Sequence, residues 1–294
     1  ARLVGGALNI IKEIKNASGE DNISICSIDS DSDGSAEVYV SAIRDSKPYS
    51  SAIEFKDNAF SVTMDNINWV LRIFEVNNRA TLVGQGIRET DGFFGPIKLL
   101  KKQGLKIVPE GDFIKDAPPF GDIYRIEPIG VKGVANGVLV LDQRGYLRLY
   151  GREDDGKWGL KWMSADFFGG TLNHAELNDS GAGTAPRLIP IEGRFFGNNN
   201  QAIIKRNIPG GLGRLAEKPL SFKTGSITSL SWDDTMKTMT KNSSTMDIQG
   251  YVSDFFMDAF DDSGRNVLVI AVSEEKGGLF GDLKSYILLL ELSL

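Results

Sequence analysis

The sequence predicts an all-β fold built from repeated four-stranded antiparallel sheets. Three features support this prediction: short runs that alternate apolar and polar residues, turn residues between the runs, and recurrence of the runs in groups of four. The 33 glycines against 10 prolines are typical of many tight turns between short strands. With 41% apolar residues, the chain can bury a sizeable core, and we expect a single domain over residues 1–294.

The predicted strands fall into five consecutive sets, and each strand is bounded by Asp, Asn, Gly or Pro. In chain order they are 24–28, 37–43, 51–56 and 60–64; 69–76, 81–87, 97–101 and 105–108; 123–129, 137–142, 146–150 and 159–163; 187–191, 201–206, 226–232 and 236–240; and 252–258, 267–273 and 285–292. The first strands recur at intervals of roughly 45 to 65 residues, which is typical of β-propeller blades with loop insertions. We therefore expect a β-propeller with five blades, or with six or seven if 163–187 or 207–226 contain further blades.

The N-terminal segment and the last set of strands are predicted to form one blade. The N-terminal segment 1–16 fits either a short helix, because Leu8, Ile11 and Ile14 recur at a spacing of three, or a strand through 7–11. The fifth set has only three strands. Since an unpaired strand leaves an exposed edge, we expect residues near 5–12 to supply the closing strand of the last blade.

An acidic loop joins the first two strands of the first set. Asp29, Asp31 and Asp33 precede Gly34 with the spacing of the carboxylates in a calcium loop, where a glycine at the sixth position makes the sharp turn. An EF-hand needs a glutamate at position 12, which here is Val40, and helices on both sides. The flanking runs alternate instead, so the loop joins two strands.

The full predicted ligand set adds two residues to the three aspartates. A backbone carbonyl at position 7 and a side-chain oxygen at position 9 correspond to Ser35 and Glu37. Oxygen ligands without histidine suit Ca²⁺ better than zinc or copper, and four carboxylates within nine residues repel one another without a cation. We therefore predict a structural Ca²⁺ site at Asp29, Asp31, Asp33, Ser35 and Glu37.

A strand, an acidic loop and a second strand resemble the FG-GAP/VCBS repeat of integrin-like β-propellers. The resemblance is clear at Asp29–Glu37 and partial at 258–266, while 193–200 keeps the turn without the acids. The aromatic-rich segment around 93–96 is similar to bacterial cell-envelope proteins with VCBS repeats. The resemblance implies an extracytoplasmic propeller, in the periplasm, on the outer membrane surface or secreted, with Ca²⁺ stiffening its loops. It implies no reaction.

Composition limits the partners. The net charge of −6 and the absence of basic runs argue against nucleic acid and anionic membranes, and no segment has the roughly 18 consecutive apolar residues of a membrane span. The single cysteine, Cys26, lies among apolar neighbours in a strand and is expected in the core. We expect a protein or glycan as the partner, because exposed propeller loops commonly bind other molecules.

Catalytic signatures are weak. His174 is the one histidine, and no nucleophile signature is present, so we predict no catalytic residues and a non-enzymatic binding or structural module. The alternative is a carbohydrate-active propeller, either a lectin or a glycoside hydrolase. Some five-bladed propellers hydrolyse glycosides with three acids at the channel mouth, and Glu127, Asp142 and Glu192 on or beside inner strands are the candidates.

Overall fold

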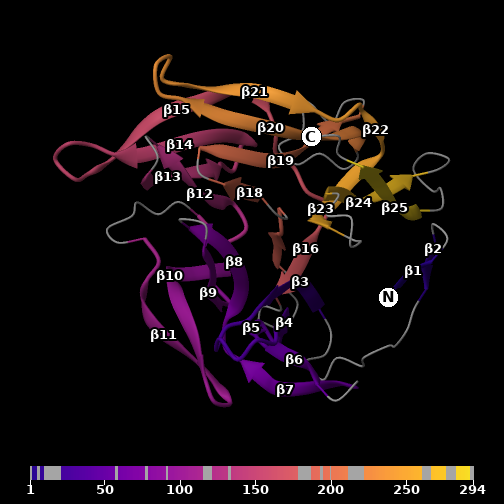
Figure 1. Ribbon diagram of the computed structural model, residues 1–294. Coiled ribbons are helices and arrows are strands. Elements are labelled where there is room, and N and C mark those ends of the chain that lie inside the picture. Colours follow the sequence, from indigo (N-terminus) through magenta and orange to yellow (C-terminus); the bar gives the residue numbers. More distant parts are fainter. Residues whose placement is uncertain are drawn as a thin grey trace.

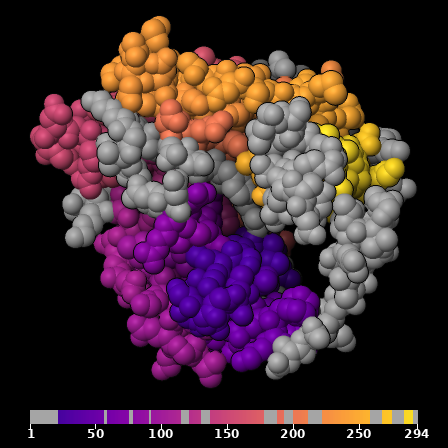
Figure 2. Space-filling model, in the orientation of Figure 1, coloured from indigo at the N-terminus to yellow at the C-terminus, as the bar shows by residue number. Residues whose placement is uncertain are grey.

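The protein folds as a ring of five antiparallel β-sheets, so the predicted five-bladed β-propeller is confirmed (Figure 1). The structure is a computed structural model, and it describes residues 2–4, 7–9, 21–56, 59–76, 79–90, 92–114, 121–131, 134–177, 187–192, 195–198, 200–210, 222–259, 266–275 and 283–291. The blades follow one another around the ring in chain order. In the same orientation, blade one (indigo) and blade four (orange) lie on opposite sides of the molecule (Figure 2).

Blades one to three match the predicted sets of strands. Blade one consists of β3 (Asp21–Ile28), β4 (Glu37–Arg44), β6 (Ser50–Lys56) and β7 (Ala59–Ile67), with the short β5 (Lys47–Pro48) beside β4. Blade two consists of β8 (Val70–Val76), β9 (Arg79–Arg88), β10 (Gly92–Gln103) and β11 (Lys106–Asp112). Blade three consists of β12 (Ile126–Val131), β13 (Val134–Leu141), β14 (Tyr146–Arg152) and β15 (Trp158–Phe167).

Blade four differs from the prediction in its first strand. It consists of β18 (Phe195–Asn198), β19 (Gln201–Pro209), β20 (Phe222–Asp233) and β21 (Thr238–Ser244), with β22 (Ile248–Gln249) beside β20. The segment predicted as the first strand, 187–191, contains β17 (Arg187–Pro190), which pairs with β16 (His174–Leu177) as a separate two-stranded sheet. Alternation identified β17 as a strand, but the partner of a strand is set by long-range packing that the local pattern does not contain.

Blade five and the N-terminus bear on the predicted closure. Blade five has three described strands, β23 (Tyr251–Ala259), β24 (Asn266–Glu275) and β25 (Leu283–Glu291). At the N-terminus, β1 (Arg2–Val4) pairs with β2 (Ala7–Asn9), so residues 7–9 form a strand, while 10–16 of the predicted helix and 10–11 of the predicted strand lie outside the described residues. Residues 5, 6 and 10–12 of the predicted closing strand lie outside the described residues, and the closure stays a prediction.

The core lies between neighbouring blades. One cluster joins blades one, two and three through Ile43, Val70, Phe74, Ile126 and Val138, all buried. A second cluster joins blades three and four. Burying one such side chain contributes about 1.5–3 kcal/mol, so contacts between the sheets hold the ring together. The inner strands of adjacent blades are thereby fixed side by side, and this sets the shape of the space between them.

Candidate functional site

A cavity of about 270 Å³ lies between the inner strands of the propeller. Blades one, two, three and five contribute residues to it, together with residues that flank the β16–β17 sheet. Its apolar lining comes mainly from isoleucines and Leu71. The polar groups that line it are the hydroxyl residues Ser24, Ser27, Tyr124 and Ser253, the amide of Asn173, and the charged residues Arg72, Glu75, Glu127 and Asp254. An apolar cavity with a few convergent polar groups is typical of a small-molecule site.

The charged centre of this pocket is a buried ion pair between blades two and three. Arg72 on β8 donates from Nη2 to Glu127 Oε2 at 2.7 Å, and the two side chains are 7% and 3% exposed. Arg72 Nη1 also donates to the carbonyls of Ile123 and Ile126, at 2.6 and 3.0 Å. Because a buried charge is tolerated only when it is paired and hydrogen-bonded, this arrangement fixes both side chains in the wall.

A tyrosine forms part of the wall beside the ion pair. The Tyr124 hydroxyl lies 2.6 Å from Ser24 Oγ on blade one, and its ring contacts Phe93 edge-on at 5.7 Å between centroids. Burial raises the pKa of Tyr124 well above its usual range, although the hydrogen bonds of Ser24 and Ser41 oppose this. The phenol therefore stays neutral and serves as a hydrogen-bonding group, not as a base.

A second group of charges lies immediately behind the wall. Arg125 Nε is 3.3 Å from Asp122 Oδ2, and Arg125 Nη2 is 3.8 Å from Glu192 Oε1, with all three side chains largely buried. Within the described residues, Arg125 Nε and Glu192 Oε2 are buried atoms that lack a hydrogen-bond partner. Burial raises the pKa of Asp122 to about 6, despite the opposing charge of Arg125. One guanidinium is thus shared between two acids, neither in ideal geometry.

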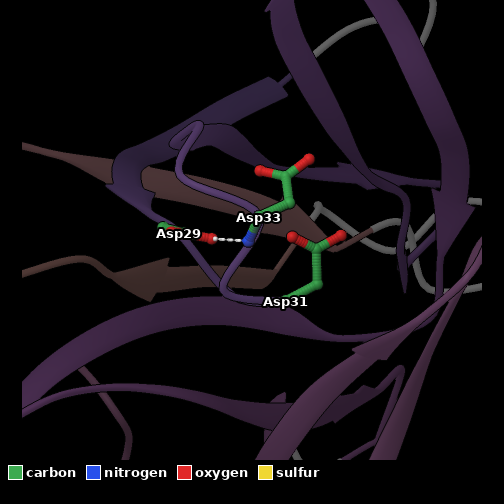
Figure 3. Close-up of side chains that lie close together, drawn as sticks. All are labelled: Asp29, Asp31 and Asp33. Atoms are coloured by element: carbon green, nitrogen blue, oxygen red, sulfur yellow. Dashed lines mark hydrogen bonds between the residues drawn. The ribbon is translucent and has the colours of Figure 1, made fainter.

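The acidic loop brings its three aspartates together (Figure 3). One oxygen from each of Asp29, Asp31 and Asp33 lies within 4.8 Å of the others, which forms a cluster that could hold a metal ion. Asp29 accepts the N–H groups of Asp33 and Gly34, at 3.1 and 3.0 Å. Gly34 has φ of 91°, a conformation that side chains rarely adopt, and this is the sharp turn that the spacing predicted.

Glu37, predicted as the fifth ligand, lies in a different set of contacts. It is fully buried, with Oε1 2.7 Å from the ammonium of Lys102 and Oε2 accepting the N–H and hydroxyl of Ser30 at 2.9 and 2.6 Å. The reason is strand alternation: Glu37 begins β4 and shares its buried face with Tyr39 and Ser41. The Ser35 N–H donates to Asp33 Oδ1 at 2.8 Å.

Lys102 links blade two to the acidic loop and blade one. Its ammonium lies 2.9 Å from Asp31 Oδ2, 2.7 Å from Glu37 Oε1 and 2.6 Å from Glu54 Oε1, and its side chain is 8% exposed. Burial disfavours the charged form, but the hydrogen bonds with Glu37, Glu54 and Asp31 outweigh it and raise the pKa of Lys102 above its usual range. The same contact lowers the pKa of Asp31. The loop therefore already has one cation of the protein beside it.

The three acids predicted for a hydrolase lie in three different settings. Glu127 lines the pocket, and Glu192 lies behind its wall, next to the lining residue Ile191. Asp142 is a turn residue: its Oδ1 accepts the N–H groups of Arg144 and Tyr146, and its Oδ2 pairs with Arg148 at 2.8 Å. The three acids do not form one site.

Sequence reasoning missed Arg72, Tyr124 and Asp254, which line the pocket with Glu127. Their positions could have identified them, because they lie on or next to the first strand of a blade, and this strand faces the centre of a propeller. Cys26 lines the same pocket and packs against the core of blades one and two while remaining partly exposed. His174 is exposed at the start of β16, with Nδ1 3.0 Å from the Leu172 carbonyl.

In the part of the chain that the structure describes, no helix is long and apolar enough to cross a membrane.

Comparisons with known proteins give fold-level similarities. No protein-family model matches the chain, and no curated protein sequence matches it. Among solved structures, it is similar to the catalytic domain of a GH62 α-L-arabinofuranosidase from Coprinopsis cinerea, with 10% identity, a TM-score of 0.45, and coverage of 99% of this chain and 95% of that one. It is also similar to a subtype N11 neuraminidase-like protein of A/flat-faced bat/Peru (H18N11), with 10% identity, a TM-score of 0.38, and coverage of 87% and 84%.

These similarities correct one expectation and leave another unconfirmed. We expected a non-enzymatic module, and the catalytic domain of an enzyme among the similar solved structures contradicts that expectation without assigning an activity to this chain. The FG-GAP/VCBS family is not confirmed, since no family model matches. The chain has a five-bladed β-propeller fold, and its chemistry has to be argued from its own residues.

Proposed function

We propose that this protein is a carbohydrate-active β-propeller that binds the end of a glycan in its central pocket. The observation that carries the proposal is the lining of the pocket, where hydroxyl, amide and carboxylate groups from several blades converge on an apolar cavity. Sugars present many hydroxyl groups on a compact ring, and such a lining supplies donors and acceptors for them. The volume of about 270 Å³ is at the low end for ligand sites, which suits one or two sugar residues.

The pocket also has the residue types that glycoside hydrolysis requires. That reaction uses two carboxyl groups on either side of the scissile bond, one acting as an acid and the other as a base or nucleophile. Glu127 on blade three is paired with Arg72 on blade two, and Asp254 lines the pocket from blade five. We assign these two carboxylates to the reaction, with Glu75 as a third acid at the same pocket.

A panel of chromogenic glycosides and natural oligosaccharides tests the proposal, with release of product and binding measured together. We expect the parent to bind or cleave members of the panel. Glu127→Gln and Asp254→Asn should each lower kcat by roughly 10²–10⁴-fold, or weaken glycan binding if the protein only binds. Glu110→Gln, an exposed acid on β11, is the control that should behave like the parent. No response to any glycan, or full activity in both pocket variants, overturns the proposal.

We also propose that the acidic loop binds a structural Ca²⁺ ion through Asp29, Asp31, Asp33 and the Ser35 carbonyl. Carboxylate oxygens within 4.8 Å of one another suit an ion whose ligands lie about 2.3–2.6 Å away. Glu37 is left out of this set, because Lys102 and Ser30 occupy its two oxygens. For a dissociation constant on the order of 10⁻⁴–10⁻³ M, 1 mM Ca²⁺ would stabilise the fold by about 0.4–1.4 kcal/mol.

Melting curves with chelator and with Ca²⁺ test this site. Asp33→Asn is the best variant, since an amide oxygen can still accept the Ser35 N–H but carries no charge. The parent should melt higher with Ca²⁺ and the variant should not. Equal shifts in both proteins, or no shift in the parent, would show that the loop is a solvated turn.

We propose in addition that the protein acts outside the cytoplasm. The resemblance of the acidic loop to extracytoplasmic Ca²⁺ loops supports this location, since a weak site is filled only where Ca²⁺ is millimolar. Cell fractionation of the native host tests it, and recovery in the cytoplasmic fraction alone contradicts it.

A further inference from the structure

The central pocket is lined by more negative than positive groups. Arg72 is the one basic residue among the described residues that line it, against the carboxylates of Glu75, Glu127 and Asp254. One guanidinium against three carboxylates gives a formal charge of −2. Arg72 is 6% exposed, and three of its N–H groups are directed at Glu127 and two backbone carbonyls. A ligand therefore meets a guanidinium already engaged by the protein.

The charges behind the wall do not reverse this balance. Lys205 on β19 of blade four reaches blade five, where its ammonium donates to the Ser253 carbonyl at 2.8 Å and lies 5.3 Å from the centre of the Tyr251 ring. Lys205 is buried and is not among the residues that line the cavity. On the other side, Asp122 and Glu192 share a single arginine. Counting only these described groups, the carboxylates outnumber the basic side chains.

We propose that the pocket selects sugars by charge: it favours an amino sugar, accepts a neutral sugar, and rejects carboxylated, sulfated or phosphorylated sugars. The physical reason is that a low-dielectric cavity strengthens the interaction between a ligand charge and fixed carboxylates. An ammonium group on the sugar is attracted by Glu75 and Asp254. An anionic group is repelled by them, and like charges brought together in a binding site weaken binding. This inference rests on the proposed carbohydrate function and names the class of sugar.

The test uses sugars that share a ring and differ in charge: glucosamine, glucose and glucuronate, with galactosamine, galactose and galacturonate as a second series. Dissociation constants are measured by ligand-observed NMR near neutral pH, at low and at high salt. We expect the amino sugar to bind at least about tenfold more tightly than the acid of its series, and the ratio to shrink at high salt because screening weakens charge interactions.

Two variants locate the selectivity. Glu75→Gln removes an exposed carboxylate and Asp254→Asn removes one from blade five, and each should lower the ratio of amino-sugar to acidic-sugar affinity by about five- to tenfold, even where the affinity for the neutral sugar also falls. Glu110→Gln on β11 is the matched control and should leave the ratio unchanged. Acidic sugars that bind as tightly as amino sugars, or a ratio unaffected by both variants, would overturn this inference while leaving a carbohydrate site in place. Failure of every sugar to bind would instead overturn the proposed function.

Discussion

Asp122 and Glu192 lie buried on either side of Arg125, and this shared guanidinium sets the chemistry of both acids. Neither acid has the short bidentate contact of a strong ion pair, and Glu192 Oε2 has no partner among the described residues. Burial then dominates for Asp122, because a carboxylate loses its hydration when it is removed from water. The pKa of about 6 follows from this position, next to the Tyr124 wall of the pocket.

The raised pKa predicts a pH-dependent stability. In the unfolded chain Asp122 ionises near its ordinary pKa of 3.8, whereas in the fold it keeps its proton up to about pH 6. At Asp122 the native state therefore binds more protons between these values, so the contribution of Asp122 to stability falls as pH rises from about 4 to 6 and then levels off. Asp122→Asn should remove roughly 1–3 kcal/mol of this fall. Urea unfolding at pH 4 and pH 7 measures it, and an identical pH dependence in the variant would contradict the assignment.

Residue positions show what local sequence can and cannot predict. The spacing of Asp29, Asp31 and Asp33 predicted their convergence, because carboxylates in a six-residue turn have few other places to go. Glu37 occupied the expected position in the sequence, yet its partner Lys102 is 65 residues away. Such a partner is chosen by the packing of one blade on the next, which the spacing within one loop does not contain.

At the scale of elements, strand existence was predictable and strand pairing was less so. Alternation identified β17, but it could not show that β17 pairs with β16, and it missed the four-residue β18 altogether. The ion pairs between blades one and two could not be predicted from the sequence either. They join Lys102 on β10 to acids on β4, β6 and the acidic loop. Lys102 acts as a tether between these two blades.

Replacing Lys102 by methionine should destabilise the fold by about 2–4 kcal/mol. The change removes the counter-charge of the buried Glu37 and leaves three carboxylates without the cation between them. Water screens part of their repulsion, because Asp31 and Glu54 are partly exposed. Lys101→Met is the matched control: its contact with Glu110 is 3.8 Å long and exposed, so its loss should change stability by less than about 0.5 kcal/mol. Urea unfolding of both variants measures the two losses of stability. Equal losses would show that the ion pairs of Lys102 do not stabilise the contact between blades one and two.

At the scale of the whole molecule, the ring is held by contacts between neighbouring sheets, and the predicted closure would join the N-terminal segment to blade five. Blade five has three described strands, and β25 exposes Ile287 and Leu289. Figure 1 draws the β1–β2 hairpin on the same side of the ring as β25. The repeat of four strands predicted the number of blades, because each blade must bury its faces against its neighbours. Pairing between the two ends of the chain would be a long-range contact, and the local pattern of either segment does not specify such a contact.

The predicted closure is tested by deleting residues 1–15. If this segment completes the last blade, its loss exposes a strand edge and opens the ring, so the melting temperature should fall markedly. A peptide of the deleted residues, added separately, should restore part of the stability by pairing with the open edge. A truncated protein that melts like the parent would show that the segment does not close the ring.

In the proposed function, the pocket between the inner strands binds a sugar. The most direct measurement is a crystal structure of the protein with the best ligand from the amino-sugar series. We expect electron density for one or two sugar residues in the cavity of about 270 Å³, hydrogen-bonded to lining groups such as Glu127, Asp254 or Asn173. A sugar bound on the outer face of a blade, with the central pocket filled only by water, would contradict it.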